Sequence, residues 1–287
     1  MPIKSILVPL AATPGDRQAL DLALALGQRN GAHIGALYPK RDPREAAAYV
    51  GMAGDITGIG QIMEQIEREA DAASTRARAS VEAWRAQAGL VEAARPVAQP
   101  HTSMGWRAPT GEPGELVIRA AAGADLVVCA GLQRDSGFAQ DLLEAALFGA
   151  ARPVVTAPPV LPRRLFGSAV IAWNGSHQAN RALAAMLTLL PRFEEVHLFC
   201  QPEGHRTPVD PADPLDLLVW HGTSARVLPA AKTDEPVGPA LLAAAASVEA
   251  SFLVMGGYTH GRVRQMMFGG VTHHVLHHAQ LPVLLVH

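Results

Sequence analysis

Short runs of apolar residues alternate along this chain with longer segments in which apolar residues recur every three or four positions. The short runs do not alternate between apolar and polar residues, as strands with one solvated face do, so they predict parallel sheets covered by helices on both faces. In the first half the pattern predicts strands at 3–9, 32–38, 93–99, 125–130 and 153–157, with helices at 14–29, 60–87, 113–122 and 136–148. In the second half it predicts strands at 168–173, 195–200, 224–228, 251–256 and 282–286, with helices at 177–190, 237–247 and 269–278.

The two halves repeat each other. Residues 6–9 match residues 169–172 at an offset of 163, and residues 126–130 match residues 252–256 at an offset of 126. The fall in offset makes the second copy 37 residues shorter in its middle. An internal repeat of this length indicates two copies of one domain.

The missing piece is a long helix. In the first copy Ile59, Ile62, Met63 and Ile66 have the i, i+3, i+4, i+7 spacing of an amphipathic helix, which we expect from about residue 60 to residue 87. Residues 211–220 of the second copy have room for a short helix at most. A proline-rich connector at 157–162 separates the copies, which gives domains at 1–158 and 165–287.

Composition narrows the classes of function. The 287 residues carry a net charge near −2, which does not suit a nucleic-acid-binding surface. No apolar run approaches the roughly 18 residues of a membrane span, and a predicted strand at the very start leaves no room for a signal peptide. Cys129 and Cys200 fall in predicted buried strands, as small apolar residues do. We therefore expect a cytoplasmic protein that binds neither membrane nor nucleic acid.

A glycine-rich turn follows the apolar run 252–254, with the sequence Met-Gly-Gly-Tyr-Thr-His-Gly from residue 255. The predicted helix at 269–278 follows it. A buried strand, a glycine turn and a helix start form the local structure that binds phosphate, because free N–H groups at the helix start donate to an anion. Arg262 and Arg264 lie in the same segment and could neutralise its charge.

Each copy resembles a universal stress protein domain, and the whole chain resembles the tandem form of that family. The resemblance rests on a strand entering a helix that carries Ala-Leu, a fourth strand running into a glycine loop, and a closing Pro-Val strand. It implies an α/β fold of two doubly wound parallel five-stranded sheets, like flavodoxins and adenine-nucleotide hydrolases. The two domains would pack as a pseudo-dimer through the strands 153–157 and 282–286. Nucleotide-binding members carry Gly, two residues, Gly, nine residues and then Gly-Ser or Gly-Thr, with an Asp after the first strand.

The second copy keeps this pattern with departures. Gly256 and Gly269 have the family's spacing, but Thr259 stands at the second glycine and Gly270 stands where Ser or Thr is usual. Asn174 replaces the Asp that contacts the sugar and metal side of the nucleotide. The resemblance thus implies one candidate site for ATP or a similar nucleotide, with Mg²⁺ as its candidate companion ion. The expected binding residues are Asn174, Gly256, Gly257, Thr259, Gly261, Arg262, Arg264, Gly269, Gly270 and Thr272, the last as a substitute hydroxyl donor.

The first copy departs further. Ala11 stands at the Asp position, Ala130 replaces the first glycine, and Gln140 and Asp141 match Gly269 and Gly270. A carboxylate at a helix start competes with phosphate for the same N–H groups, so we expect no ATP in this half.

Four histidines fall on the last predicted helix. His273 and His277 have the i, i+4 spacing of paired metal ligands, and so do His274 and His278. The two pairs cannot point at one ion, and no Cys, Asp or Glu stands nearby. We expect no metal site, with His273 and His277 as the only candidates.

The sequence holds no Gly-x-Ser-x-Gly elbow and no Gly-Lys-Ser/Thr loop. The leading hypothesis is therefore a non-enzymatic stress-response protein with one nucleotide site. Two alternatives stay open, namely a ligand-free interaction scaffold and a weak nucleotide hydrolase. Association of two tandem chains into a further homodimer also stays open.

Overall fold

The computed structural model describes residues 2–44, 59–93, 101–132, 137–190, 192–200, 210–229, 235–257 and 270–287, without the side chains of Ile59 and Ile62. The chain divides into two compact units. The N-terminal unit comprises residues 4–130 and 136–150, and the C-terminal unit comprises residues 151–287 together with 1–3 and 131–135. Within the described residues, no helix is long and apolar enough to cross a membrane.

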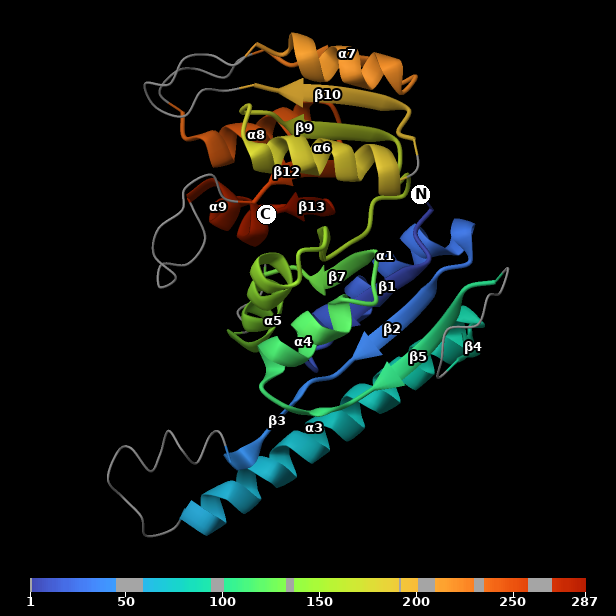
Figure 1. Cartoon of the computed structure of the whole chain (residues 1–287), viewed down its shortest axis with the longest axis vertical. Coiled ribbons are helices and arrows are strands. Elements are labelled where there is room, and N and C mark those ends of the chain that lie inside the picture. The colour runs from blue at the N-terminus through green and yellow to red at the C-terminus, as the bar shows by residue number, and fades with distance from the viewer. Residues whose placement is uncertain are drawn as a thin grey trace. The chain divides into compact units, whose positions relative to one another are not determined.

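The N-terminal unit is built on a parallel sheet with the strand order β7-β1-β2-β5-β4 (Figure 1). Its strands are β1 (Ser5–Pro9), β2 (His33–Leu37), β4 (Val91–Glu92), β5 (Ser103–Arg107) and β7 (Leu126–Ala130). The central strand β1 pairs with β2 from Ser5 opposite His33, and with β7 from Ile6 opposite Leu126. The helices of this unit are α1 (Gly15–Gly27), the short η1 (Gln28–Asn30), α3 (Ile59–Ala88), α4 (Pro113–Ala121) and α5 (Gly137–Gly149).

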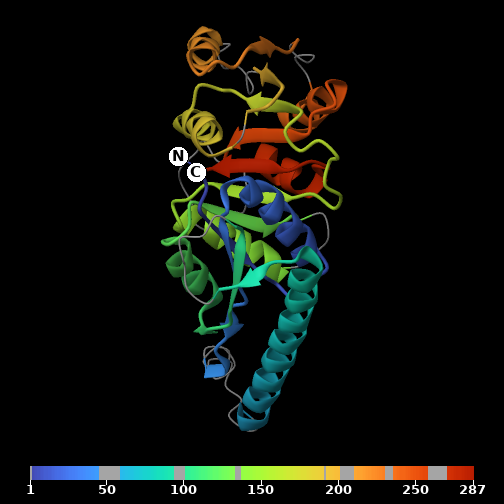
Figure 2. The ribbon, with the colours of Figure 1, turned by 90° about the vertical axis from the view of Figure 1, so that its right-hand side faces the viewer.

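Helix α3 confirms the long amphipathic helix expected from the sequence and extends past the end of the sheet (Figures 1 and 2). Its C-terminal part buries Ala77, Val81 and Trp84, and the indole Nε1 of Trp84 donates to Asp21 Oδ1 of α1 at 2.7 Å. Its N-terminal part runs beside a two-stranded ribbon of β3 (Lys40–Arg41) and β6 (Thr110–Gly111). This helix therefore has its C-terminal end anchored in the core, while its N-terminal part lies beside the ribbon.

The C-terminal unit repeats the arrangement with the strand order β11-β10-β9-β12-β13-β8. Its parallel strands are β9 (Ser168–Ala172), β10 (Glu195–Phe199), β11 (Ala225–Val227), β12 (Phe252–Gly256) and β13 (Val283–Val286), and its helices are α6 (His177–Leu189), α7 (Ala212–Trp220), α8 (Val237–Ser247) and α9 (Gly270–His278). Strand β8 (Val154–Ala157) adds an antiparallel sixth strand, with Thr156 opposite Val283. The last strands of the two repeats therefore pair as the resemblance implied, while the pseudo-dimer packing of whole domains stays a prediction.

The fold class is confirmed as alternating α/β with predominantly parallel sheets. The strand composition differs in detail from two five-stranded sheets, because β8 lies with the C-terminal unit and β4 lines the far edge of the N-terminal sheet. The predicted strand at 93–99 falls almost wholly outside the described residues, and the strand paired with β2 is instead β5 (Ser103–Arg107). The sequence boundaries at 1–158 and 165–287 stay predictions.

Candidate functional site

The strand order of the C-terminal unit reverses between β9 and β12. The chain proceeds from β9 outward to β10, while β12 lies against the opposite side of β9, with Met255 opposite Ala172. In open α/β sheets, the crevice beyond the carboxyl ends of two such strands is where ligands bind. The turns that begin at Asn174 and at Gly256 both leave the sheet here, so the structure brings together the two sequence segments assigned to one site.

The turn after β9 is closed by its own side chains. Asn174 Oδ1 accepts a hydrogen bond from the backbone N–H of Ser176 at 3.1 Å, and Ser176 Oγ caps α6 by accepting from Ala179 N at 3.2 Å. Gly175 between them has φ +71°, which glycine adopts without strain. Because Oδ1 is committed to the turn, the exposed Asn174 would meet a ligand through its amide NH₂ group.

Gly256 lies against the start of α6. A Cβ atom built on Gly256 would lie 2.7 Å from the backbone N of Ala179 and 2.7 Å from the backbone carbon of Gln178. Backbone atoms of a helix cannot move aside cheaply, so a side chain at Gly256 would push β12 and α6 apart. The first glycine of the loop is thus required by packing, whether or not a ligand binds.

Part of the predicted loop lies outside the described residues, namely Thr259, Gly261, Arg262, Arg264 and Gly269. At its near end, the backbone N–H of Gly257 donates to Val286 O at 2.8 Å, which holds the start of the loop on β13.

At the far end of the loop, Gly270 begins α9, and a Cβ built there meets no atom of the described residues within 4 Å. Thr272 is buried on the covered side of α9, so its hydroxyl is turned away from solvent. No described residue therefore obstructs a hydroxyl-bearing side chain at Gly270.

The histidines of α9 stack in pairs. The ring centroids of His273 and His277 lie 4.1 Å apart and those of His274 and His278 lie 4.2 Å apart. His277 Nδ1 contacts the carbonyl of His273, and His278 Nδ1 contacts that of His274, each one turn back. Among the described residues, no group of three or more His, Cys, Asp or Glu side chains could hold a metal ion.

The equivalent turn of the N-terminal unit has the same backbone conformation but a different internal partner. Ala12, the counterpart of Gly175, has φ +57°. Asp16 of α1 accepts from Ala11 N at 3.0 Å and from Thr13 N at 3.3 Å, and its Oδ1 lies 3.4 Å from Thr13 Oγ1. Thr13 is the counterpart of Ser176, so Asp16 performs from the helix the role that Asn174 Oδ1 performs from the turn.

Asp16 is a buried carboxyl group in a folded helix start. Burial raises its pKa from 3.8 to about 6, against the opposing effect of the hydrogen bonds from Ala11, Thr13 and Ala12. Sequence reasoning identified Ala11 as the missing Asp position and did not single out Asp16. A carboxylate in the first helical turn after a small-residue turn was the signal that could have found it.

Other side chains of the N-terminal unit also fill the space around this turn. A Cβ on Gly15 would lie 3.0 Å from Ala130 Cβ, so Ala130 fills the space against the start of α1. Arg41 Nη2 lies 3.3 Å from Asp141 Oδ2, and the Arg41 guanidinium lies 4.9 Å from the ring centroid of Phe138. Arg41 thus joins the ribbon to the start of α5.

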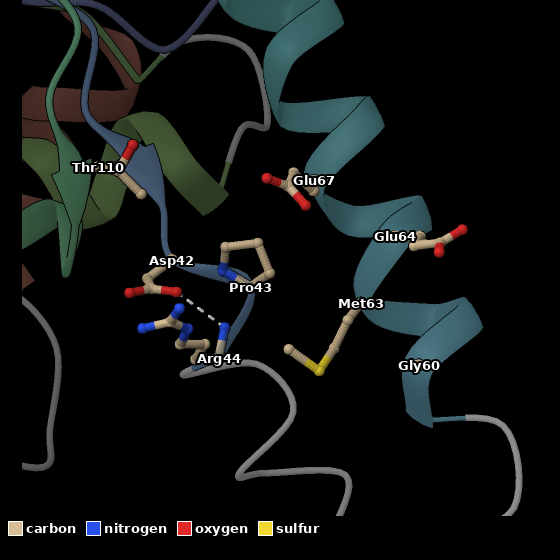
Figure 3. A pocket seen from close by; sticks show the side chains of 8 residues that line it. All are labelled: Asp42, Pro43, Arg44, Gly60, Met63, Glu64, Glu67 and Thr110. Carbon is tan, nitrogen blue, oxygen red and sulfur yellow. Dashed lines mark hydrogen bonds between the residues drawn. The ribbon is translucent and has the colours of Figure 1, made fainter.

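A separate hollow of about 490 Å³ lies between α3 and the ribbon of the N-terminal unit (Figure 3). Its described lining carries the carboxylates Asp42, Glu64 and Glu67 and one cation, Arg44, whose backbone N–H donates to Asp42 Oδ1 at 2.9 Å. Three carboxylates against one guanidinium repel a phosphate group, so this hollow does not suit a nucleotide.

Comparisons with known proteins agree with this architecture. The model of the universal stress protein family matches residues 224–287, which include β11, β12, α9 and β13. A universal stress protein from Archaeoglobus fulgidus DSM 4304 has the same fold over 98% of this chain and 95% of its own, with a TM-score of 0.62 and 18% identity. A functionally unknown protein from Pseudomonas aeruginosa PAO1 aligns over 99% of this chain and 92% of its own, with a TM-score of 0.51 and 12% identity. No curated protein matches the chain. The resemblance found in the sequence is therefore confirmed, directly in the C-terminal segment and by fold along the chain.

Proposed function

From this confirmed resemblance to tandem universal stress proteins, we propose that the chain is a stress-response protein whose C-terminal unit binds ATP or a similar nucleotide without turning it over. The nucleotide lies beyond the ends of β9 and β12. The amide of Asn174 contacts the ribose side, while the glycine loop and the start of α9 receive the phosphates.

One observation carries this proposal. The two turns that the family uses for its nucleotide emerge side by side where the strand order reverses, with Met255 opposite Ala172 at the ends of the strands. Among the described residues, no atom lies within 4 Å of a Cβ built on Gly270, which supports access of a phosphate to the start of α9. Gly256 contributes less to the argument, because helix packing alone accounts for it.

The N-terminal unit is proposed to bind no nucleotide. The Asp16 carboxylate takes the N–H groups of its turn, and a negative group there repels an incoming phosphate. Asp141, which matches Gly270 in the alignment of the repeats, adds a second carboxylate at the start of α5 and is paired with Arg41. The C-terminal unit thus binds the nucleotide, whereas side chains of the N-terminal unit occupy the N–H groups of the equivalent turn.

Turnover of the nucleotide is not part of the proposal. Asn174 offers a hydrogen-bonding amide where the family's Asp offers a charge that attracts Mg²⁺, so metal-assisted hydrolysis lacks its anchor. The weak-hydrolase alternative predicts phosphate release that rises when Asn174→Asp restores the charge. The scaffold alternative predicts no nucleotide binding at all.

Calorimetry with ATP and Mg²⁺ tests the proposal on ligand-free protein. We expect measurable heat for the wild type, and tighter binding for Gly270→Ser by about tenfold, the worth of one added hydrogen bond to a charged group. Gly137→Ser is the matched control, because Gly137 begins α5 of the other unit and a Cβ built there also meets no described atom within 4 Å. It should bind as the wild type does.

Absence of heat at about 1 mM ATP for both the wild type and the Asn174→Asp/Gly270→Ser double variant would refute a nucleotide site here. Gly256 variants are unsuitable for this test, because they disturb the packing of α6 in any case.

A further inference from the structure

A small cavity of about 100 Å³ lies between the end of α6 and the turn after α7. We call it the α6–α7 hollow. Its lining includes buried apolar residues, namely Met186, Leu190, Phe193 and Val196. It also includes three polar residues, namely Arg192, His221 and Thr223. Val196 is the second residue of β10 and Thr223 comes just before β11, so the hollow lies at the amino ends of these strands. The candidate nucleotide site lies beyond the carboxyl ends of β9 and β12, at the opposite end of the sheet.

The apolar side of the hollow is fixed by packing. The ring of Phe193 makes edge contacts with Phe166 and Phe252, with ring centroids 5.7 Å and 5.5 Å apart. Met186 of α6 and Val196 of β10 are buried in the core of the same unit. A ligand that enters the hollow therefore meets an apolar surface that is already in place, and its binding is not opposed by the cost of ordering these side chains.

The guanidinium of Arg192 lies against the turn that closes the hollow. A Cβ atom built on Gly222 would lie 3.4 Å from Nη1 and 3.4 Å from Nη2 of Arg192, which places the guanidinium beside Thr223. Within the described ranges, no ion pair joins Arg192 to a carboxylate. The N–H donors of this guanidinium are thus not taken by a carboxylate of the described chain, and an anion can accept from them.

The equivalent turn of the N-terminal unit has a different chemistry. Gly89 closes the turn after α3 with φ +66°, as Gly222 does after α7 with φ +69°. The next residue donates its N–H back to its helix in both units, but it is Leu90 in the N-terminal unit and Thr223 in the C-terminal unit. The cation at the N-terminal turn, Arg85, donates to Leu90 O at 3.1 Å and is paired with a carboxylate of its own helix at 2.8 Å. The hydroxyl and the arginine of the α6–α7 hollow are therefore not requirements of this position in the fold.

The volume and the lining together define the class of ligand. An apolar protein cavity of about 150 Å³ accommodates the six carbon atoms of benzene, so the hollow of about 100 Å³ accommodates about four. Its apolar side disfavours an ion that is hydrated all round, such as inorganic phosphate, because buried charge without partners is costly. A planar guanidinium forms two parallel hydrogen bonds to a carboxylate. The hollow thus suits a molecule with a short hydrocarbon chain and one carboxylate at its end.

We propose that the α6–α7 hollow binds a short-chain monocarboxylate. The hydrocarbon chain lies on Phe193 and Val196, the carboxylate accepts hydrogen bonds from the Arg192 guanidinium, and the hydroxyl of Thr223 donates a further one. This site does not rest on the proposed nucleotide binding, because it lies at the other end of the sheet, and both ligands can be bound together.

Titration of the full chain with sodium butyrate at constant ionic strength tests the proposal, with amide chemical shifts followed by two-dimensional NMR. We expect saturable shifts around Phe193 and Thr223 with a Kd of about 1 mM, from about three buried carbon atoms and one hydrogen bond to a charged group. Acetate should bind about 15-fold more weakly, since each missing methylene costs about fourfold. Hexanoate should not gain the same factor, because butyrate already fills the hollow. An excess of ATP should leave the butyrate shifts unchanged.

Two substitutions test the polar contacts. Arg192→Gln should weaken butyrate binding by at least about fivefold, the effect of losing a charged hydrogen bond at a site that solvent partly screens. Arg181→Gln is the matched control, because it removes the same charge from an exposed position of α6, and it should bind as the wild type does. Thr223→Leu introduces the residue type of Leu90, removes the hydroxyl and fills part of the hollow, so it should abolish saturable binding. Circular dichroism checks that each variant is folded.

Absence of saturable shifts up to about 50 mM butyrate would overturn the proposal. Equal affinities for acetate and butyrate would also overturn it, because the apolar side of the hollow would then not hold the chain. The same holds for wild-type affinity in both Arg192→Gln and Thr223→Leu, or for an equal loss in Arg192→Gln and Arg181→Gln.

Discussion

Replacing the Asp16 carboxyl group by an amide should change how stability depends on pH. In the folded chain, burial raises the pKa of Asp16 from 3.8 to about 6, so the folded state holds the proton more tightly than the unfolded state does. The favourable contribution of Asp16 is therefore complete below pH 4 and is lost as the pH rises through 6. With 1.36 kcal/mol for each pKa unit, the loss comes to about 3 kcal/mol.

Asp16→Asn removes this dependence, because an amide does not titrate in this range. We expect the free energy of unfolding of the wild type to fall by up to about 3 kcal/mol relative to Asp16→Asn between pH 4 and pH 7. Urea unfolding followed by circular dichroism at half-unit pH steps measures the difference. Carbon-13 chemical shifts of the carboxyl groups give the titration of Asp16 directly. A difference curve that stays flat over this range would refute the reasoning, since it would mean that water solvates Asp16 as in the unfolded chain.

A pair of substitutions tests the carboxylate of Asp16 as a hydrogen-bond acceptor separately from its charge. The pair Ala11→Asn and Asp16→Ala copies the residues of the C-terminal turn, where Asn174 and Ala179 stand at the equivalent positions. Asp16→Ala alone leaves Thr13 N without its acceptor, which costs about 1–3 kcal/mol at a pH where the carboxyl is protonated. The side-chain oxygen of the introduced asparagine should restore the bond and with it most of the stability, with no pH dependence from position 16. Failure of the pair to recover stability would show that the two turns are not interchangeable.

Three further substitutions test the packing. Gly256→Ala should lower the free energy of unfolding by about 1–3 kcal/mol through its clash with α6, whereas Gly270→Ala should be tolerated; equal melting temperatures for the two would contradict the packing argument. Gly175→Ala should cost about 1 kcal/mol at φ +71°, while Ala12→Gly should cost nothing because it relieves φ +57°, and thermal melts compare them. Trp84→Phe should cost about 1–2 kcal/mol by removing the hydrogen bond to the α1 carboxylate, measured by urea unfolding.

Much of this architecture could be read from the sequence because hydrophobic periodicity was strong. The long helix was predicted at 60–87 and is observed as α3 (Ile59–Ala88). The helix at 237–247 coincides with α8 (Val237–Ser247). Strand β5 was missed, since Ser-Met-Gly-Trp-Arg has little apolar character of its own and takes its place through pairing with β2. The spacing of apolar residues predicts helices and strands that bury one face of their own. It does not predict a strand that is stabilised mainly by pairing with a neighbouring strand.

The neighbouring positions of two predicted site residues followed from the sequence, and their hydrogen bonds did not. In a doubly wound parallel sheet the ends of the first and fourth strands face one another, which sets Asn174 near Gly256, and β9 and β12 are indeed paired. Ala11 stands where the family has an Asp, and the carboxylate of Asp16, five positions later in the chain, accepts a hydrogen bond from the Ala11 N–H. The sequence comparison did not predict this role of Asp16. An alignment compares residues position by position, whereas an N–H group donates to any acceptor within reach.

The contact between the fourth strand and the first helix of each repeat has a consequence for how the two halves could have diverged. In the N-terminal unit the glycine is on the helix, at Gly15, facing Ala130; in the C-terminal unit it is on the strand, at Gly256, facing Gln178. In the N-terminal unit a Cβ is accommodated at Ala130 because the facing helix residue is glycine. In the C-terminal unit the backbone atoms of Gln178 and Ala179 lie as close to Gly256 as the Gln178 side chain does, so the position of the helix itself requires glycine on the strand. The N-terminal repeat was thus free to lose its loop glycine by a single substitution, and the C-terminal repeat is not. Gly256 would persist in a descendant that had stopped binding any nucleotide, so related sequences are better screened for ligand binding at positions 174 and 270.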